Sequence, residues 1–209
     1  MIELYTWGTP NGHKANIMVE EVGLPYEVHP IDIGTGAQKA PAYLAINPNG
    51  RIPAIVDREG DKVTRVFESG AILVYLAEKT GKLLPSDPAR RAEVMGWLFW
   101  QVGGLGPMIG QWGHFNRMDE KIPYAIDRYR DESLRLLGVL DEQLGRGEYL
   151  AGDYSIADVA CFSWTKGGLD YFTEADPSVA GRFPNARAWV ARVGARPAVQ
   201  KGLSVPEKK

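Results

Sequence analysis

Near its amino end the chain reads Ile2-Glu3-Leu4-Tyr5-Thr6-Trp7-Gly8-Thr9-Pro10-Asn11-Gly12. Its first six residues alternate as in a β-strand, and the last four have the composition of a turn. From His13 to Val22 the apolar residues follow helical spacing. Gly23-Leu24-Pro25 ends that helix, and Tyr26 to Ile33 returns to extended alternation. This order predicts a parallel strand pair joined by a helix.

The next stretch adds the remaining elements of a small mixed sheet. A turn at Asn47-Pro48-Asn49-Gly50 separates a helical pattern from two alternating runs, which Glu59-Gly60-Asp61 joins as a hairpin. Gly81 follows a further helical pattern and is placed to cap it. The predicted elements are a helix over 38–46, strands over 52–56 and 62–67, and a helix over 69–80. The first part of the chain therefore has the predicted order β-α-β-α-β-β-α.

Strand patterns stop at Pro85-Ser86-Asp87-Pro88, which has the composition of a linker. Beyond it, apolar residues recur at helical spacing from Ile126 to Leu144, and Ser155-Ile156-Ala157-Asp158 has the spacing of a capping box. Phe183-Pro184 precedes the helix that we predict to be the last. We therefore predict an α/β domain over 1–81, a linker over 82–88 and an all-helical domain over 89–209.

The composition argues against several classes of function. The 209 residues include 24 Lys and Arg and 26 Asp and Glu, so the net charge of −2 gives no general attraction to nucleic acid or an anionic membrane. No run reaches the ~20 apolar residues of a membrane span, and the start has no secretory pattern. One cysteine and three scattered histidines do not suggest a metal site. We expect a cytoplasmic protein without metal, nucleic-acid or membrane partners.

Three local sequences carry a family resemblance. They are Asn49-Gly50-Arg51-Ile52-Pro53, Phe67-Glu68-Ser69-Gly70-Ala71-Ile72 and the capping box at residues 155–158. Together with the element order, they make the chain resemble a cytosolic glutathione transferase across essentially its whole length. The resemblance implies a thioredoxin-like α/β domain followed by an all-helical bundle domain, and glutathione as the co-substrate.

The resemblance also implies how glutathione is held. The Ile52-Pro53 bond would be cis, with the main chain of Ile52 pairing with the cysteinyl unit of the peptide and Pro53 shaping that contact. Ser69 and its amide would hold the γ-glutamyl carboxylate at a helix start, where an anion is favoured. Glu68 would help to position the charged amino end.

The turn at Thr9-Pro10-Asn11-Gly12 decides the subclass. Members of the family place a Tyr, Ser or Cys near this point to act on the glutathione sulfur, but Tyr5 lies within the predicted strand and the segment has no serine or cysteine. Thr9 and Asn11 are the available polar side chains. Hydrogen-bond donors and the positive end of a helix would lower the pKa of a thiol bound there.

Longer strings resemble the bacterial nu-class transferases, which are disulfide-bond oxidoreductases. These are Thr-Pro-Asn-Gly-His-Lys at 9–14, the run from Phe67 to Leu73 and the run from Trp97 to Met108. This resemblance implies that Thr9 and Asn11 approach the sulfur atoms and that Gln38 binds the peptide. It also implies that Arg128 reaches glutathione across a homodimer, although a solvated helix residue would explain Arg128 equally well.

The missing cysteine points to a mechanism in which the ligand brings its own sulfur. We therefore predict a glutathione-dependent reductase of small disulfides acting by thiol–disulfide exchange. Conjugation of glutathione to electrophiles is one alternative, and a non-catalytic glutathione-binding regulatory protein is another. Substitution of Asn11 by Ala should weaken catalysis more than substitution of Cys161, because Cys161 is predicted to be a buried small hydrophobe.

Some features are predicted to be structural. The glycines between Gly104 and Gly110 follow a helix rather than a strand, so we expect a helix kink instead of a dinucleotide loop. Asp158 is assigned to the capping box, where its replacement by Ala should cost about 1 kcal/mol of stability. Three large residues could line a substrate pocket or fill a core: Trp100, Met108 and Trp112.

Overall fold

The computed structural model describes residues 1–207, which form two compact units. The first unit contains Met1–Pro85 and the segment from Gly194 onward, and the second contains Ser86–Val193. The division at Pro85 falls within the predicted linker. The C-terminal segment differs from the predicted domain boundaries, because it groups with the first unit and not with the helical one.

The first unit is built on a four-stranded mixed sheet in the order β2-β1-β3-β4. β1 (Ile2–Thr6) pairs in parallel with β2 (Tyr26–Pro30) and antiparallel with β3 (Ala54–Glu59), which forms a hairpin with β4 (Lys62–Phe67). The predicted parallel pair, β1 with β2, and the predicted hairpin of β3 with β4 are both confirmed. Register places Leu4 opposite Val28 and Ile55. The two central strands, β1 and β3, contribute buried apolar residues to the core: Ile2, Leu4, Ala54, Ile55 and Val56.

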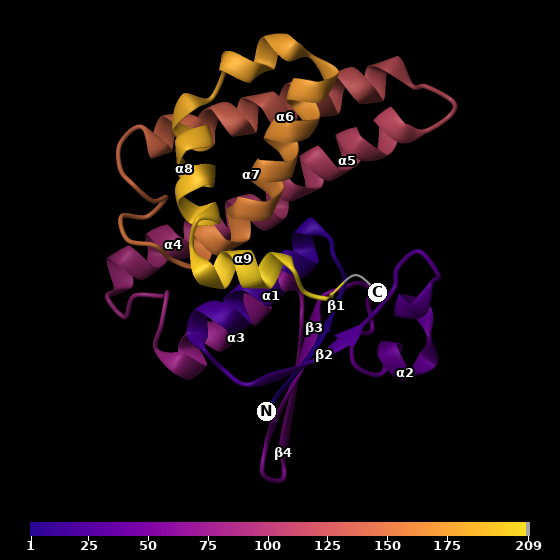
Figure 1. The fold of residues 1–209 in the computed structure, drawn as a ribbon, viewed down its shortest axis with the longest axis vertical. Helices are drawn as coiled ribbons and strands as arrows, with labels where there is room; N and C mark the ends of the chain where they lie inside the picture. Colours follow the sequence, from indigo (N-terminus) through magenta and orange to yellow (C-terminus); the bar gives the residue numbers. More distant parts are fainter. Residues whose placement is uncertain (208–209) are drawn as a thin grey trace. The chain divides into compact units, whose positions relative to one another are not determined.

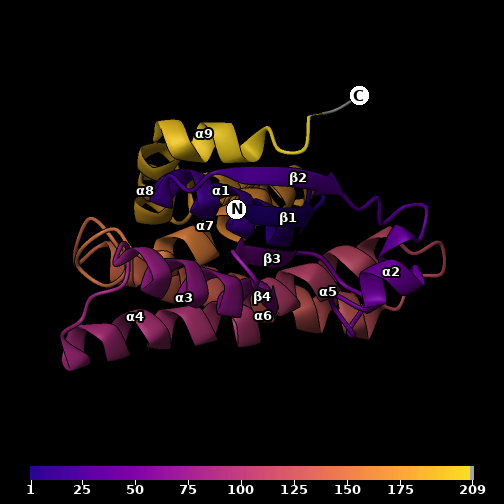
Figure 2. The same ribbon diagram turned by 90° about the horizontal axis from the view of Figure 1, so that it is seen from below.

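Helices lie on both sides of this sheet. α1 (Pro10–Val22) and α3 (Ser69–Thr80) pack against each other, and the strands separate them from α2 (Pro41–Leu44) in both views (Figures 1 and 2). Gly81 caps α3 with a φ of 68°, as predicted. With the helices of the second unit, this arrangement confirms the fold class of a thioredoxin-like α/β domain and an all-helical domain.

The single helix predicted over 38–46 is wrong. The structure has a short 3₁₀ helix, η1 (Ala37–Lys39), followed by α2, and Ala40 between them is extended with ψ of 140°. Pro41 explains the break, because proline lacks an N–H and pushes the preceding residue out of the helical region.

One helix of the first unit was not predicted. α9 (Pro197–Leu203) lies alongside α1 (Figures 1 and 2), and the backbone of Ile17 passes so close to Gly202 that a Cβ there would lie 2.7 Å from the Ile17 nitrogen. Asn16 donates to the Val205 carbonyl at 2.7 Å. The guanidinium of Arg196 pairs with both carboxylate oxygens of Glu21. The end of the described chain is therefore fixed to α1.

The second unit is helical, as predicted. Within residues 1–207, no helix is both long enough and apolar enough to cross a membrane. α5 and α6 lie side by side in Figures 1 and 2. The elements are α4 (Pro88–Trp100), the π-helix η2 (Gln101–Leu105), α5 (Gly106–Arg117), α6 (Pro123–Leu144), α7 (Ile156–Ala175), η3 (Pro177–Gly181) and α8 (Pro184–Gly194).

The glycine-containing stretch after residue 100 is helical. It runs from α4 through the π-turn into α5, without the strand that a dinucleotide loop requires. A π-turn is a common cause of a bend in a helix. The prediction that this stretch is a helix irregularity is confirmed.

Asp158 holds the start of α7 through a network of hydrogen bonds. Its carboxylate accepts from the backbone N–H groups of Leu150 and Ser155, from the Ser155 hydroxyl and from the indole of Trp189 at 2.9 Å. Burial raises the pKa of this carboxyl, and the hydrogen bond from Trp189 opposes that rise. The predicted capping box is confirmed.

We expect Asp158→Ala to lower the free energy of unfolding by about 3 kcal/mol, because several buried donors would lose their acceptor. This loss of stability exceeds the ~1 kcal/mol expected from the capping box alone, because Asp158 also accepts from Leu150 and Trp189. Chemical denaturation measures the change, and Asp170→Ala on the same helix is the control. Asp170 pairs with Lys166 on the surface, so its loss should cost less than about 0.5 kcal/mol. Equal effects of the two substitutions would contradict the assignment.

Candidate functional site

The turn before α1 places a hydroxyl at the positive end of a 13-residue helix. Thr9 is the N-cap, and its Oγ1 accepts from the Gly12 N–H at 3.2 Å. Because a hydroxyl that accepts one hydrogen bond keeps its own proton, Thr9 can still donate to a ligand atom. No acidic residue stands in the first turn. This end of α1 therefore favours an anion such as a thiolate.

Gly12 allows the helix start to lie against the end of β1. A Cβ at this position would overlap the carbonyl oxygen of Trp7 and lie 2.8 Å from the Thr6 hydroxyl. The chain thus reverses from strand to helix with its two backbones in direct contact. This close approach fixes where Thr9 and Asn11 stand, and both side chains are half-buried.

The Tyr5 side chain makes its contacts within the sheet. Its hydroxyl donates to Glu3 at 3.0 Å and its ring stacks on His29, with centroids 4.7 Å apart. Burial, and then the hydrogen bond to Glu3, raises the pKa of Tyr5. These contacts keep the phenol protonated and bonded within the sheet, which agrees with the prediction that Tyr5 is packed.

The loop before β3 positions a cis peptide bond between Ile52 and Pro53. The Arg51 carbonyl accepts from the Asn47 amide at 2.7 Å and from the Tyr43 hydroxyl at 2.5 Å. Burial raises the pKa of Tyr43 to about 12, so this donor stays protonated. Ile52 precedes the ladder, whose pairing begins at Ala54. Ile52 therefore lies outside the sheet pairing, just before β3, and its pairing with an extended peptide stays a prediction.

The start of α3 carries Glu68 and Ser69 side by side. Glu68 is exposed and adopts a φ of 70° and a ψ of 121°, a conformation that side chains rarely take. Its Oε1 accepts from the Asn49 amide at 3.2 Å, which ties this loop to the one before β3. Ser69 is 8% exposed at the helix start. The strained backbone directs the Glu68 carboxylate to the surface beside Ser69.

Sequence reasoning missed Lys14. It is 1% exposed, and its Nζ donates to the Ser69 hydroxyl at 3.3 Å. The helical period offered a clue, because Lys14 lies one turn before the buried Met18. The sequence could not show that this face meets Ser69, 55 residues away.

Gln38 lies in η1 and is half-buried. Its Nε2 is 3.5 Å from the Ile33 carbonyl oxygen, and its Oε1 has no hydrogen-bond partner within residues 1–207. The side chain therefore retains hydrogen-bonding capacity for a ligand. Its role toward a peptide stays a prediction.

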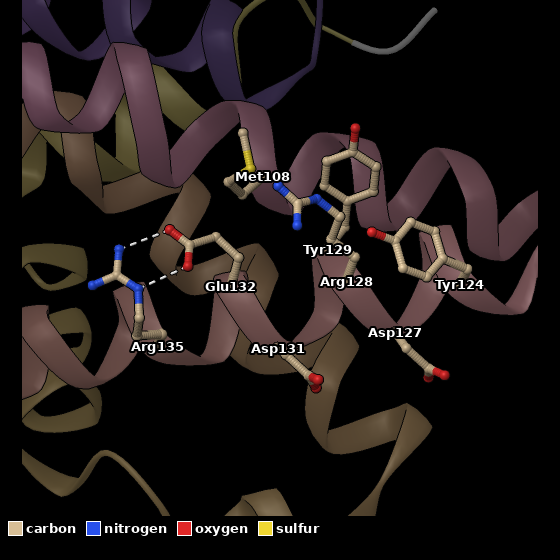
Figure 3. Close-up of a pocket in the computed structure, with 8 residues that line it drawn as sticks. All are labelled: Met108, Tyr124, Asp127, Arg128, Tyr129, Asp131, Glu132 and Arg135. Carbon is tan, nitrogen blue, oxygen red and sulfur yellow. Dashed lines mark hydrogen bonds and ion pairs between the residues drawn. The ribbon is translucent and has the colours of Figure 1, made fainter.

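Arg128 belongs to the second unit. It lies on α6, is exposed, and lines a cavity of about 780 Å³ together with Met108 and Tyr129 (Figure 3). Arg128 forms no ion pair with another residue of the described chain, whereas the neighbouring Arg135 pairs with both oxygens of Glu132. The hydrogen bond from Arg135, helped by the charge of Arg128, lowers the pKa of Glu132.

The remaining candidates divide between cavity and core. Met108 on α5 lines the cavity together with residues of α6, whereas Trp112 is 3% exposed and stacks on Phe172 in the core. Trp100 is half-buried and packs edge-on against Trp97. Cys161 is fully buried in α7, as predicted. Among the residues that the structure describes, no group of His, Cys, Asp and Glu could hold a metal ion.

Two family models match the chain. Residues 1–78 match the glutathione S-transferase N-terminal domain and residues 112–197 match the glutathione S-transferase C-terminal domain. A protein of Escherichia coli strain K12 named disulfide-bond oxidoreductase YfcG is 46% identical over 208 residues, which cover 97% of this chain and 94% of that protein.

Solved structures agree with these matches. A glutathione transferase from Pseudomonas putida, with one glutathione disulfide bound per subunit, superposes with a TM-score of 0.93 at 42% identity, covering 98% of this chain and 91% of that one. A glutathione transferase from Burkholderia graminis, with two glutathione molecules bound per subunit, superposes with a TM-score of 0.93 at 46% identity. The match covers 100% of this chain and 89% of that one.

We expect Gly12→Ala to destabilise the first unit by about 3 kcal/mol, because the new methyl group would be forced against the backbone of Trp7. Thermal or chemical unfolding measures the loss. Gly8→Ala is the matched control from the same turn, since a Cβ at Gly8 meets nothing within 4 Å. If both variants are as stable as the parent, the close approach is not a constraint.

Glu68→Gly and Glu68→Ala form a second matched pair. Both remove the carboxylate, but only glycine relieves the positive φ, so the Gly variant should be about 1 kcal/mol more stable than the Ala variant. Urea unfolding of the two proteins measures the difference. Equal stabilities would mean that the backbone at residue 68 relaxes when its side chain is shortened.

Proposed function

Because this chain belongs to the glutathione S-transferase family, we propose that it is a glutathione-dependent disulfide-bond reductase. The observation that carries the proposal is the turn before α1, where a threonine hydroxyl and an asparagine stand at the positive helix end in place of a tyrosine, serine or cysteine. Tyr5 is bonded to Glu3. In this proposal, the thiolate that reacts therefore belongs to the bound ligand.

In this proposal the first unit binds glutathione along three contacts. Ser69 and its amide hold the γ-glutamyl carboxylate, with Glu68 beside the amino group. The main chain of Ile52, shaped by Pro53, pairs with the cysteinyl unit. Thr9 and Asn11 hold the sulfur, and the glutamine at position 38 adds a contact to the peptide. The buried serine and the strained Glu68 support this assignment.

The chemistry is two successive thiol–disulfide exchanges. A glutathione thiolate attacks one sulfur of the substrate disulfide, forms a mixed disulfide and releases the other half as a thiolate. A second glutathione thiolate then attacks the glutathione sulfur of the mixed disulfide, which gives glutathione disulfide and releases the remaining half. Two glutathiones are oxidised and one disulfide is reduced. Thr9 and Asn11 stabilise the thiolate, and the site supplies proximity.

The proposal includes a cytoplasmic homodimer. Arg128 is assigned to the glutathione bound by the partner subunit, and its exposed position, with no ion pair to any of residues 1–207, supports this role. The similar structures from Pseudomonas putida and Burkholderia graminis, which hold glutathione disulfide or glutathione, support the choice of ligand. The physiological substrate is taken to be a small disulfide.

Turnover of hydroxyethyl disulfide, compared with that of chlorodinitrobenzene, tests the proposal. With glutathione present, we expect the disulfide to be reduced well above the uncatalysed rate and more efficiently than the electrophile is conjugated. The opposite ranking would establish a conjugating transferase. Binding of glutathione with neither activity would identify a non-catalytic binding protein.

Variants locate the chemistry. Asn11→Ala and Thr9→Ala should each lower kcat for the disulfide by about tenfold or more, since each removes a group that stabilises the thiolate. Cys161→Ala is the control and should keep the parent rate, because that thiol is fully buried in another unit. Equal losses from Asn11→Ala and Cys161→Ala would place the chemistry elsewhere.

A further inference from the structure

Thr6 places a hydroxyl on an otherwise apolar face of the sheet. It is the last residue of β1, and its exposed fraction is 0%. Because side chains alternate along a strand, Thr6 points to the same face as Ile2 and Leu4, which are both buried and apolar. Valine has nearly the same shape and would bury no polar group there. The hydroxyl of Thr6 therefore calls for a physical reason.

The Thr6 hydroxyl is also without a hydrogen-bond partner within residues 1–207, although its oxygen is buried. A buried polar group in this state lowers the stability of the fold. The backbone of Thr6 is fixed, since its carbonyl accepts from the Ile31 N–H at 2.9 Å. The hydroxyl proton is not fixed, because a hydroxyl rotates about its C–O bond and no acceptor among these residues holds it.

The Thr6 hydroxyl lies against the first turn of α1. Its oxygen is 2.8 Å from the position that a Cβ on Gly12 would take. The N–H of Gly12 donates to Thr9 Oγ1 at 3.2 Å, so residue 12 is a neighbour of both threonine hydroxyls. The Thr6 hydroxyl therefore stands inside the protein, directly behind the turn that carries Thr9 and Asn11.

A hydroxyl with a freely turning proton can stabilise an anion that it does not touch. In a low-dielectric interior its dipole turns the positive end toward nearby negative charge, and the interaction is stronger than it would be in water. The start of α1 acts in the same direction, because the N-terminus of a helix carries partial positive charge. Negative charge at the turn would therefore be stabilised from within the protein by Thr6, as well as by Thr9 and Asn11 at the turn itself.

We propose that Thr6 is a buried dipole that stabilises the thiolate of glutathione held at this turn. The inference rests on the proposed function, because it concerns the thiolate that Thr9 and Asn11 are proposed to contact. Thr6 is a supporting residue and not a catalytic one, since its oxygen is buried behind the turn. A hydroxyl that lowers the stability of the fold is then explained by its effect on the sulfur.

A pH titration of glutathione bound to the intact protein tests this role, because the ultraviolet absorption of a thiolate reports the pKa of its thiol. Thr6→Val removes the hydroxyl and nearly keeps the shape of the side chain. It should raise the pKa of the bound thiol by about 0.5 unit. At a pH below that pKa it should also slow disulfide reduction by about twofold, since the smaller thiolate fraction is partly compensated by a greater nucleophilicity.

Thr165→Val is the matched control. Thr165 is also 0% exposed, and its hydroxyl likewise has no hydrogen-bond partner within residues 1–207, but it belongs to α7 of the second unit. Its substitution should leave the pKa of the bound thiol unchanged. Thr6→Ser and Thr6→Ala form a second pair, which serves if Thr6→Val does not fold. These two variants differ only by the hydroxyl, so only the Ala variant should raise the thiol pKa.

The outcomes separate this inference from the proposed function. An unchanged thiol pKa in folded Thr6→Val, or an equal rise in Thr165→Val, would overturn the role of Thr6 and leave the proposed function in place. Equal thiol pKa values in the Thr6→Ser and Thr6→Ala variants would do the same. If the parent protein does not bind glutathione, or binds it with a thiol no more acidic than that of free glutathione, the proposed sulfur site and this inference both fail.

Discussion

The end of β1 and the start of α1 can touch only because residue 12 has no side chain. This contact determines the path of the chain between the strand and the helix. It brings the Thr9 hydroxyl to the helix terminus as a cap. Further along the same helix, the Lys14 ammonium group donates to the Ser69 hydroxyl at the start of α3. This steric constraint therefore fixes the start of a helix that carries Thr9 at its N-cap and contacts Ser69 of α3 through Lys14. Thr9 and Ser69, which stand at the two ends of the proposed ligand site, are far apart in the sequence.

The site combines rigid support with one strained residue. Asn47 and Tyr43 hold the loop that carries the cis bond, and Asn49 links that loop to Glu68. Glu68 keeps a backbone conformation that costs free energy, and the surrounding hydrogen bonds maintain it. Strain of this kind is typical of functional sites, because the conformation that presents a side chain to a ligand need not be the most stable one for the chain alone.

Much of the first unit could be predicted, because its patterns are local. Alternation and helical spacing predicted the strands, α1 and α3, and the capping box at Ser155 was visible in four consecutive residues. The helix over 38–46 was mispredicted because the apolar spacing outweighed Pro41. α9 was missed because a seven-residue helix gives little periodic pattern. Its packing against α1, far away in the sequence, cannot be predicted from the local residues. The Lys14–Ser69 contact could not be predicted for the same reason, since it joins positions 55 residues apart.

The attachment of α9 to α1 has a consequence for how the protein is made. The first unit is discontinuous: its sheet is encoded first, the whole second unit follows, and α9 comes last. During synthesis the nascent chain can form the sheet early. Until residue 205 has been translated, however, α1 lacks its contacts with α9, the hydrogen bond from Asn16 to the Val205 carbonyl and the ion pair between Glu21 and Arg196. The helix that carries the proposed sulfur-binding turn is thus secured only after the whole second unit has been synthesised, which delays a competent site until that unit and α9 have both emerged.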